Sequence, residues 1–536
     1  MKPLKTGASP RTVVLTGSSL TIGELVAVSR QDLPVDIGPE SMEAIGRSRH
    51  LVDLWGRSGK VIYGVTTGFG EMVQWLIPPD YEKELQENLI RSHAANVGDA
   101  FPREVVRAVL LLRLNCLSQG HSGVRVETVK TLLGMINEKV HPQIPELGSV
   151  GASGDLSPLA HAALVACGEW FAEYKGEVLP GSEALHRAGI RKLDLGYKEG
   201  LALINGTSVM SAVGALLIHD ADTLIKTAEI AAALAAEVLH ASTKPFDEIG
   251  HAVKPHPGQM ASARNMRTLL AGSRLTRSQE EIEKTLEPSL NGTVTQVEAS
   301  LQNAYTLRCI PQVLGAVRDA VEYARRAIEI EMNSATDNPL IFPEEADVFH
   351  GGNFHGQTVA IPLDTLAIAI TEVGVISERR IDRLLDKNHN EGLPPFLVPG
   401  PAGLFCGFAG AQYTATSLVA ENRTLCTPAS IQSIPSNGGN QDIVSMGLIA
   451  ARKASRILKN AEYILAIELL AACQAADIRG TSNLSPAGQA AYESVREYVP
   501  TLKKDRAMST DISKIAEIIR LRRIVTDVEE TTGPLA

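Results

Sequence analysis

Gly148-Ser-Val-Gly-Ala-Ser-Gly-Asp-Leu-Ser-Pro-Leu-Ala-His161 is the most informative stretch of this 536-residue chain. A phosphate-binding loop would end in Lys followed by Ser or Thr, and this stretch lacks that ending. A nucleophile elbow would place glycine two residues after Ser153, and that position is Asp155. The common structural expectation is therefore a turn rich in glycine and serine that leads into a helix beginning near Leu156.

The three residues Ala152, Ser153 and Gly154 also permit a chemical interpretation. Glycine has no Cβ, so the Gly154 nitrogen is sterically free and its backbone can adopt unusual angles. In a tightly bent loop that nitrogen can reach the carbonyl carbon of Ala152. Cyclisation and loss of water from Ser153 would give an imidazolone ring with an exocyclic methylidene, which is an electrophile that no standard side chain supplies.

Outward from this stretch, the sequence changes character near residue 200. Later residues carry long helical periodicity with few breakers. The predicted helices cover residues 201–241, 297–334, 358–385, 409–424 and 444–475. Helices of this length bury their apolar stripes against one another, in one bundle or across subunits.

Residues 1–200 are interrupted by glycine and proline, which indicates shorter elements. The predicted pieces include a strand at 60–65 and helices at 104–117 and 126–139. We therefore expect a mixed N-terminal region over residues 1–200 and a long-helix bundle over 201–536. The charged residues after 500 are expected to form one or two peripheral helices.

The composition is that of an ordinary globular protein, with 21% charged residues, 44% hydrophobic residues and a net charge of −10. Nothing in it indicates a nucleic-acid surface. The six cysteines form no C-x-x-C pair and have no zinc-ligand spacing to histidine. The N-terminus resembles no signal peptide, and no run of about eighteen apolar residues occurs. These features predict a cytoplasmic enzyme with no metal or nucleotide, no nucleic-acid partner and no membrane partner.

Several motifs in order give nearly the whole chain a resemblance to the aromatic amino acid ammonia-lyases and aminomutases, which carry a 4-methylidene-imidazol-5-one group (MIO). Besides the stretch quoted above, they are Tyr63-Gly-Val-Thr-Thr-Gly-Phe-Gly70, Leu203-Ile-Asn-Gly-Thr207, Tyr305-Thr-Leu-Arg-Cys-Ile-Pro-Gln312, Asn338-Pro-Leu340, Gly352-Asn-Phe-His-Gly356 and Gln441-Asp-Ile-Val-Ser-Met-Gly447. The resemblance implies the mainly α, histidase-like fold of this superfamily. It also implies a homotetramer whose active sites are shared between protomers, and autocatalytic formation of MIO from Ala152, Ser153 and Gly154.

The resemblance assigns roles to four further residues. Tyr63, which alone would be read as a packed core tyrosine, becomes the base that removes the substrate Cβ proton. Its pKa of about 10 must then be lowered. Asn205 would hydrogen-bond the MIO group, and Tyr305 would approach that group from a neighbouring subunit. Arg308, three residues from Tyr305 on one predicted helical face, would bind the substrate carboxylate.

Other positions resemble the family less directly. Phe354 resembles a pocket phenylalanine, and Gln441 resembles a polar residue near the substrate amine. Asn437 stands where phenylalanine-type lyases often carry Glu. Gly70 would let the loop after Tyr63 close as a lid. Asn303 is a departure, because many members have Asp there.

Two residues indicate the substrate. His93 matches the position where tyrosine-specific members have His, and Tyr413 resembles a second partner of the substrate hydroxyl. A site built to bind a phenol hydroxyl rejects the analogue that lacks it. Glu71, directly after Gly70, resembles the pattern of tyrosine aminomutases. The prediction is a tyrosine 2,3-aminomutase that converts L-tyrosine to β-tyrosine through an MIO-bound amine and 4-coumarate.

Three alternatives remain beside this prediction. A tyrosine ammonia-lyase would release 4-coumarate and ammonia. A histidine ammonia-lyase would need a polar pocket for imidazole, and Gln441 stands where histidine-specific members carry Glu. An inactive helical scaffold is disfavoured by the intact Tyr63, Ser153 and Arg308.

Overall fold

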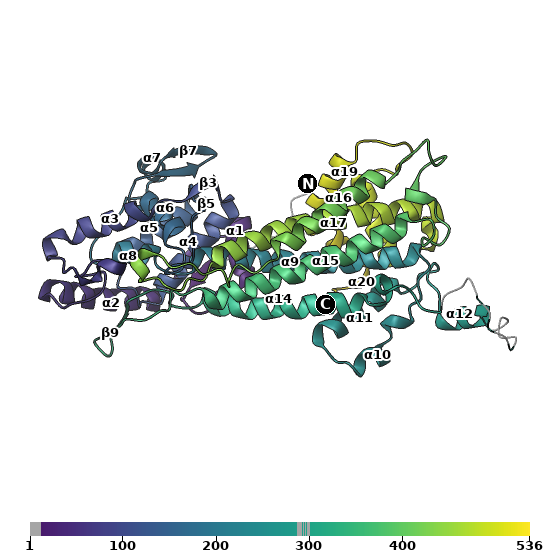
Figure 1. The fold of residues 1–536 in the computed structure, drawn as a ribbon. Coiled ribbons are helices and arrows are strands. Elements are labelled where there is room, and N and C mark those ends of the chain that lie inside the picture. Colours follow the sequence, from purple (N-terminus) through teal and green to yellow (C-terminus); the bar gives the residue numbers. More distant parts are fainter. Residues whose placement is uncertain (1–11, 287–291, 293, 295, 297–300) are drawn as a thin grey trace. The chain divides into compact units, whose positions relative to one another are not determined.

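The computed structural model describes residues 12–286, 292, 294, 296 and 301–536 (Figure 1). The chain forms two compact units, each built from several segments. The first contains Met1–His219, Ala324–Asp364 and Pro428–Arg452, and the second contains Asp220–Tyr323, Thr365–Thr427 and Lys453–Ala536. We expected a boundary near residue 200, but the first unit also includes two later segments, because the chain returns to it twice.

The first unit combines helices with short strands. Its helices are α1 (Ile22–Gln31), α2 (Pro39–Ser58), α3 (Glu82–His93), α4 (Arg103–Ser118), α5 (Val126–Asn137), α6 (Leu156–Ala166), α7 (Gly181–Arg187), α8 (Glu199–Ile204) and the 3-10 turns η1 (Gly70–Gln74), η2 (Pro79–Tyr81) and η6 (Asn437–Gly439). All residues of α4 from Val105 to Ser118 are buried, so this helix forms the centre of the unit. The predicted helices at 104–117 and 126–139 correspond to α4 and α5.

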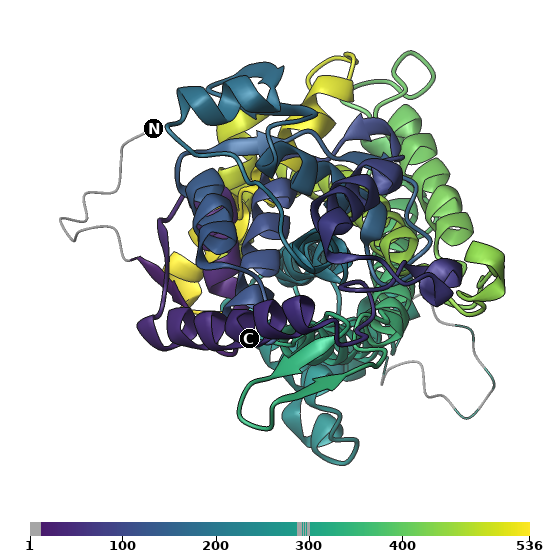
Figure 2. The same cartoon turned by 90° about the vertical axis from the view of Figure 1, so that its left-hand side faces the viewer.

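The described strands of the first unit form four small sheets. Strands β1 (Val13–Leu15) and β2 (Val35–Ile37) pair in parallel, and β3 (Val97–Ala100) pairs antiparallel with β5 (Pro145–Leu147). Strand β6 (Phe171–Tyr174) lies between β4 (Val140–Pro142) and β7 (Glu177–Pro180). Strands β8 (Leu340–Phe342) and β9 (Asp347–Phe349) form a hairpin at the edge of the unit. This hairpin is green in Figure 2.

The predicted strand at 60–65 is wrong, because these residues form a turn. The amides of Val65 and Thr66 both donate to the Ile62 carbonyl, at 3.1 and 3.0 Å. Gly64 has a φ of +65°, a backbone conformation that glycine adopts easily. Local turn bonds therefore outweigh the β-branched composition of this stretch.

The second unit is helical. Its complete helices are α10 (Glu248–Ala252), α11 (Pro257–Leu270), α12 (Gln279–Leu286), α13 (Tyr305–Arg308), α16 (Ala409–Leu425), α18 (Pro486–Tyr498), α19 (Ser509–Arg520) and α20 (Arg523–Thr532), with 3-10 turns η3 (Lys244–Phe246), η5 (Pro395–Leu397) and η7 (Thr481–Asn483). Four long helices contribute residues to both units: α9 (Ser208–Val238), α14 (Ile310–Met332), α15 (Gln357–Leu385) and α17 (Gly447–Arg479). Within this unit α15, α16 and α17 lie side by side (Figure 1), and the Arg380–Glu468 ion pair between α15 and α17 is fully buried.

Most of the predicted long helices are confirmed. The ranges 358–385, 409–424 and 444–475 match α15, α16 and α17 within a few residues. The range 201–241 is interrupted at residues 205–207, where Gly206 has a φ of +134°. Residues 297–300 of the range 297–334 lie outside the described part, residues 301–304 are not helical, and α13 and α14 begin at 305 and 310. The one or two helices predicted after residue 500 correspond to α19 and α20.

Two helices, α9 and α15, are long and apolar enough to cross a membrane by length and hydropathy alone. Most of each apolar window is buried inside the protein, 83% for α9 and 72% for α15. Both therefore have the packing of core helices.

Candidate active site

A cavity of about 950 Å³ lies in the first unit, and nine of the predicted site residues line it. These are Tyr63, Gly70, His93, Ala152, Ser153, Asn205, Phe354, Asn437 and Gln441. They come from the turn before η1, from α3, from the loop before α6 and from loops far apart in the sequence. The fold therefore gathers the motifs that the sequence keeps separate.

The tripeptide before α6 is sharply bent. Ser153 and Gly154 have φ angles of +50° and +76°. A Cβ on Gly154 would lie 2.2 Å from the Gly206 carbonyl oxygen, so only glycine fits here. The Gly206 amide donates to the Ser153 carbonyl at 3.1 Å, and the Asp155 amide donates back to the Gly206 carbonyl at 2.8 Å. This turn fits the bent loop that closure between the Gly154 nitrogen and the Ala152 carbonyl carbon requires.

Asp155, directly after the tripeptide, joins it to the start of α9. Its Oδ2 accepts hydrogen bonds from the Val209 and Met210 amides at 2.9 and 2.8 Å. The carboxyl is fully buried, and burial raises its pKa to about 7 although these hydrogen bonds oppose the shift. The sequence motifs assign Asp155 no role, although an acidic residue directly after Gly154 is a signal that could have indicated one.

Tyr63 lies in the turn before η1 and faces Phe69 edge-on, with ring centroids 6.2 Å apart. Its hydroxyl oxygen accepts a hydrogen bond from the Gly70 amide at 3.0 Å. Burial raises the pKa of the phenol, and the bond from Gly70 only partly opposes this. The surroundings of the phenol within this chain therefore do not supply the lowering of the Tyr63 pKa that a role as base requires.

The loop after Tyr63 packs against η6. Gly70 has a φ of +55°, and a Cβ there would lie 1.9 Å from Asn437 Nδ2. A Cβ on Gly438 would lie 3.0 Å from Glu71 Cγ, so Glu71 packs against η6. Glu71 does not line the cavity. Gln441 is fixed by Ser436, whose hydroxyl lies 3.0 Å from Gln441 Oε1. Gly70 and Glu71 are thus both in close contact with η6.

His93 is the last residue of α3, and its Nδ1 lies 2.9 Å from the Leu89 carbonyl oxygen. A carbonyl oxygen only accepts, so in the neutral ring Nδ1 carries the proton and Nε2 is an acceptor. The Ser157 hydroxyl donates to the His93 carbonyl at 2.6 Å and ties this end of α3 to α6. Leu85 and Leu89, one turn apart on the same row as His93, also line the cavity, and no sequence motif indicated either residue.

Asn205 is held by groups that form a buried polar cluster. Its Nδ2 donates to Asp337 Oδ1 at 3.0 Å and to the Asn338 carbonyl at 3.1 Å. Asp337 in turn forms a fully buried ion pair with Lys198 at 2.6 Å. Burial alone would raise the pKa of Asp337, but Lys198 and Arg113 outweigh it and the pKa is lowered. Because the amide nitrogen is committed, the orientation of the Asn205 side chain is fixed.

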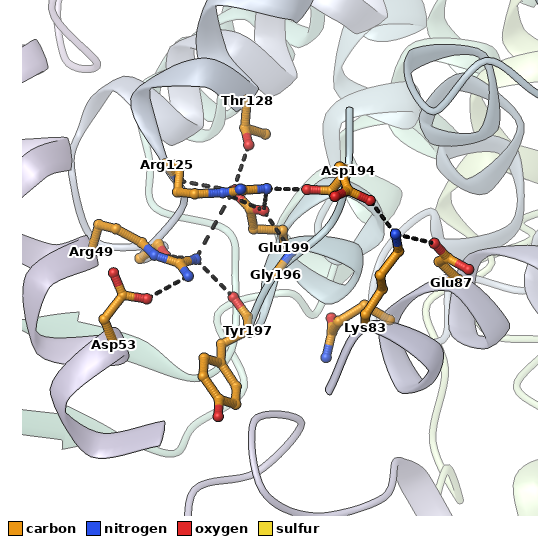
Figure 3. A network of polar contacts seen from close by, with 12 residues as sticks. Arg49, Asp53, Lys83, Glu87, Arg125, Thr128, Asp194, Gly196, Tyr197 and Glu199 are labelled. Atoms are coloured by element: carbon orange, nitrogen blue, oxygen red, sulfur yellow. Dashed lines mark hydrogen bonds and ion pairs between the residues drawn. The ribbon is translucent and has the colours of Figure 1, made fainter. Parts of the chain in front are cut away.

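A network of charged residues anchors the first residue of α8 (Figure 3). Glu199 is fully buried and accepts hydrogen bonds from Arg125, Thr128 and the Gly196 amide. Burial raises its pKa, but the bonds from Arg125 and Thr128 outweigh this, so the pKa is lowered and the carboxylate stays charged. Lys83 of α3 contacts Asp194 beside this network. Two helices that carry cavity residues are therefore joined by the same network.

Three predicted site residues belong to the second unit and do not line this cavity. Tyr305 and Arg308 lie on one face of α13, as predicted, with the guanidinium 4.7 Å from the Tyr305 ring centre. Tyr305 and Tyr413 are 70% and 71% exposed.

Asn303 exchanges two hydrogen bonds with the Ser242 backbone, including one from its Nδ2 that an Asp could not make. Among the described residues, no group of three His, Cys, Asp or Glu side chains is placed to hold a metal.

Comparison with known proteins identifies the family of the chain. The family model for aromatic amino acid lyases matches residues 20–497. The histidine ammonia-lyase of Caldanaerobacter subterraneus subsp. tengcongensis is 49% identical over 97% of this chain and 98% of its own length. The tyrosine ammonia-lyase of Cupriavidus metallidurans is 49% identical over 95% and 96%.

A third relative, the MIO-dependent tyrosine 2,3-aminomutase of Streptomyces globisporus, is 48% identical over 95% of this chain and 94% of its own length. The crystal structure of the tyrosine aminomutase from that organism matches with a TM-score of 0.95 and 46% identity, covering 98% and 100% of the two chains. The mainly α fold expected from the sequence is thereby confirmed. The chain belongs to the aromatic amino acid lyase family, whose members include ammonia-lyases and aminomutases.

Proposed function

We propose that this protein is an MIO-dependent tyrosine 2,3-aminomutase that converts L-tyrosine to β-tyrosine. The observation that carries the proposal is that one cavity is lined by Ala152 and Ser153 of the bent tripeptide, by Tyr63 and by His93. These three features correspond to an electrophile, a base and a partner for a phenol hydroxyl. Formed from Ala152, Ser153 and Gly154, the MIO group supplies an electrophilic carbon for the substrate amine.

Tyr63 takes the proton from the substrate Cβ in this proposal. Burial raises its pKa, so the phenolate needs a nearby positive charge before it can act as a base. Arg308 supplies such a charge if it reaches the cavity from another protomer, where its planar guanidinium also binds the substrate carboxylate. This is one reason to propose a homotetramer with shared active sites. The exposure of Tyr305 and Tyr413 also supports it, since both would be covered in an assembly.

The selectivity for tyrosine follows from the hydrogen bonding of His93. With its Nδ1 bonded to the Leu89 carbonyl, the neutral ring presents Nε2 as an acceptor for the substrate phenol hydroxyl. Leu85 and Leu89 provide an apolar wall beside the aromatic ring. Tyr413 from another protomer is proposed as the second partner of the hydroxyl.

The choice of aminomutase over ammonia-lyase rests on the loop after Tyr63. An aminomutase must hold 4-coumarate until the amine returns to Cβ, and a closed loop lengthens that time. The close packing of Gly70 on Asn437 and of Glu71 on Gly438 supports a closed loop. Tyrosine ammonia-lyase is the second candidate, favoured by the relative from Cupriavidus metallidurans.

The deciding experiment is a time course with L-tyrosine, analysed by chiral chromatography. We expect β-tyrosine as the main early product, with less 4-coumarate. Mainly 4-coumarate and ammonia from the first time point would favour the tyrosine ammonia-lyase. A parallel incubation with L-histidine tests the histidine ammonia-lyase, and faster turnover of histidine than of tyrosine would overturn the proposed substrate.

A further inference from the structure

Gln86 is a fully buried polar residue in the middle of α3, two turns before His93. Burying an amide is unfavourable unless its donor and acceptor are both bonded. In Gln86 both are bonded, and both partners are backbone groups of other segments. Its Nε2 donates to the Gly64 carbonyl at 3.0 Å, and its Oε1 accepts from the Leu201 amide at 3.2 Å.

The two partners of Gln86 belong to segments that carry reacting groups. Gly64 follows Tyr63 in its turn, and Leu201 lies in α8, four residues before Asn205. The three segments are also in close steric contact. A Cβ on Gly64 would lie 2.6 Å from the Leu201 side chain, and one on Gly200 would lie 2.7 Å from the Gln86 carbonyl. The junction therefore has no space to shift without losing these contacts.

We propose that Gln86 is a positioning residue that sets the place of Tyr63 relative to Asn205 and His93. The inference rests on the proposed function, because it gives Tyr63 the role of the base. Gln86 does not line the cavity, so it acts only through the Tyr63 turn and through α8. The bond to the Gly64 carbonyl holds the turn, and the bond from the Leu201 amide holds α8 at the same side chain.

Two substitutions separate these bonds. Gln86→Met keeps the length of the side chain and removes both hydrogen bonds. Gln86→Glu keeps an acceptor for the Leu201 amide and, as a carboxylate, removes the donor to Gly64. A matched control is Gln474→Met in the second unit. Gln474 is also buried and exchanges two hydrogen bonds with the backbone of one residue, Leu502, which also belongs to the second unit and does not line the cavity.

The first measurement does not depend on activity. Hydrogen–deuterium exchange of the intact protein should rise in the peptide spanning residues 62–70 for both Gln86 variants and stay unchanged for Gln474→Met. Exchange in the α8 peptide should rise in Gln86→Met and much less in Gln86→Glu. Unchanged exchange at 62–70 in both Gln86 variants would overturn the inference.

The second measurement is steady-state kinetics with L-tyrosine. A base displaced by about 1 Å slows the chemical step by about 100-fold, so kcat should fall by about 10- to 100-fold in Gln86→Met with a much smaller change in KM. The ultraviolet absorbance of the MIO group should remain, which separates a misplaced base from a failure to form the group. Equal losses of kcat in Gln86→Met and Gln474→Met would show a general stability effect and overturn the positioning role.

A Tyr63→Phe variant distinguishes failure of the inference from failure of the proposed function. If Tyr63→Phe retains full turnover, the assignment of the base is wrong whatever Gln86 does. If Tyr63→Phe is inactive while Gln86→Met keeps the full kcat, only the positioning role is wrong.

Discussion

At the scale of single residues, the site depends on a few positions where no other side chain fits. Gly154 and Gly206 face each other so closely that a Cβ on the first would meet the carbonyl oxygen of the second at 2.2 Å. A Cβ on Gly206 would lie 2.2 Å from the Thr336 carbonyl oxygen. The chemistry that we propose for Ser153 therefore takes place on a backbone held from both sides.

Ser153→Ala tests that chemistry directly. The substitution removes the hydroxyl whose loss would create the methylidene, and alanine differs from serine only by that oxygen. We expect near-total loss of turnover with L-tyrosine, no MIO absorbance, and an unchanged far-ultraviolet circular dichroism spectrum. Full activity in Ser153→Ala would refute the proposed mechanism.

His93→Phe tests the assignment of the substrate. The variant leaves the tyrosine hydroxyl without the Nε2 acceptor, and an unpaired buried polar group costs about 1–3 kcal/mol. The ratio of kcat/KM for tyrosine over phenylalanine should fall by about 10- to 100-fold. His186→Phe in α7, which makes the same substitution away from the cavity lining, serves as a control and should leave the ratio nearly unchanged. An unchanged ratio in His93→Phe would mean that His93 does not bind the hydroxyl.

His161 gives a prediction about pH and stability. It is buried against Trp170, neither ring nitrogen has a hydrogen-bond partner in the described structure, and burial lowers its pKa to about 4. The unfolded chain takes up the proton near pH 6.5 and the folded chain only near pH 4, so stability present above pH 6.5 is lost as the pH falls through this range. His161→Phe keeps the ring against Trp170 and removes this loss.

Melting temperatures of the wild type and His161→Phe between pH 7.5 and pH 4.5 provide the measurement. The difference between the two proteins should grow in favour of the variant as the pH falls. Parallel curves over the whole range would contradict the assignment.

At the scale of elements, the sequence predicted long, regular helices better than the segments that carry the site. The ranges of α15, α16 and α17 follow from periodicity, because an apolar stripe of that length has one stable packing. The turn at Tyr63 resembled a strand because its β-branched residues favour strands. The hydrogen bonds that bend it leave no pattern in the composition. The break at Asn205–Thr207 was missed for another reason, because it is fixed by contacts with the tripeptide fifty residues earlier.

The candidate site was predictable where a motif names its residues, and not where tertiary contacts assign the role. Ser153, Tyr63 and His93 were found through motifs, and the structure brings all three to one cavity. Gln86 and Asp155 were not singled out, because their importance lies in partners that are distant in the sequence. The desolvation that raises the Tyr63 pKa within this chain could not be read from the motif, because it depends on the packing around the phenol.

Because Glu199 is buried in the network at the start of α8, we expect removal of its charge to lower the free energy of unfolding substantially. Glu199→Gln leaves the guanidinium of Arg125 without its buried carboxylate, which costs about 3 kcal/mol. Denaturant unfolding followed by circular dichroism would measure this loss. The exposed pair Glu177–Arg187 is the control, and Glu177→Gln should change stability by less than about 1 kcal/mol. Similar losses in both variants would contradict the importance of burial.

At the scale of the whole molecule, our proposal completes the active site with residues from more than one chain. Tyr63, Ala152 and Ser153 line the cavity of the first unit, while Tyr305, Arg308 and Tyr413 do not line it. Light scattering should therefore give a mass of four times the 57.3 kDa chain. A monomeric mass for fully active protein would contradict shared sites.

Mixing two inactive variants tests the sharing itself. Tyr63→Phe and Arg308→Met should each lose most of their turnover of L-tyrosine. When the two are co-expressed, some sites take an intact Tyr63 from one chain and an intact Arg308 from another, so activity should return to a fraction of the wild-type value. Co-expression that restores nothing, in protein shown to contain both chains, would place both residues in the same protomer's site.

The pairing of the tripeptide with Gly206, and of Gly206 with Thr336, has a consequence for how the enzyme matures. The backbone that must bend is held by residues made about 50 and 180 positions later in synthesis, so a growing chain lacks the means to close the ring until those parts have been added and have folded. Under our proposal, the fraction of molecules that contain the mature group then equals the fraction of chains that have reached the native state. The group stays in place after it forms, so it marks each molecule that has folded correctly.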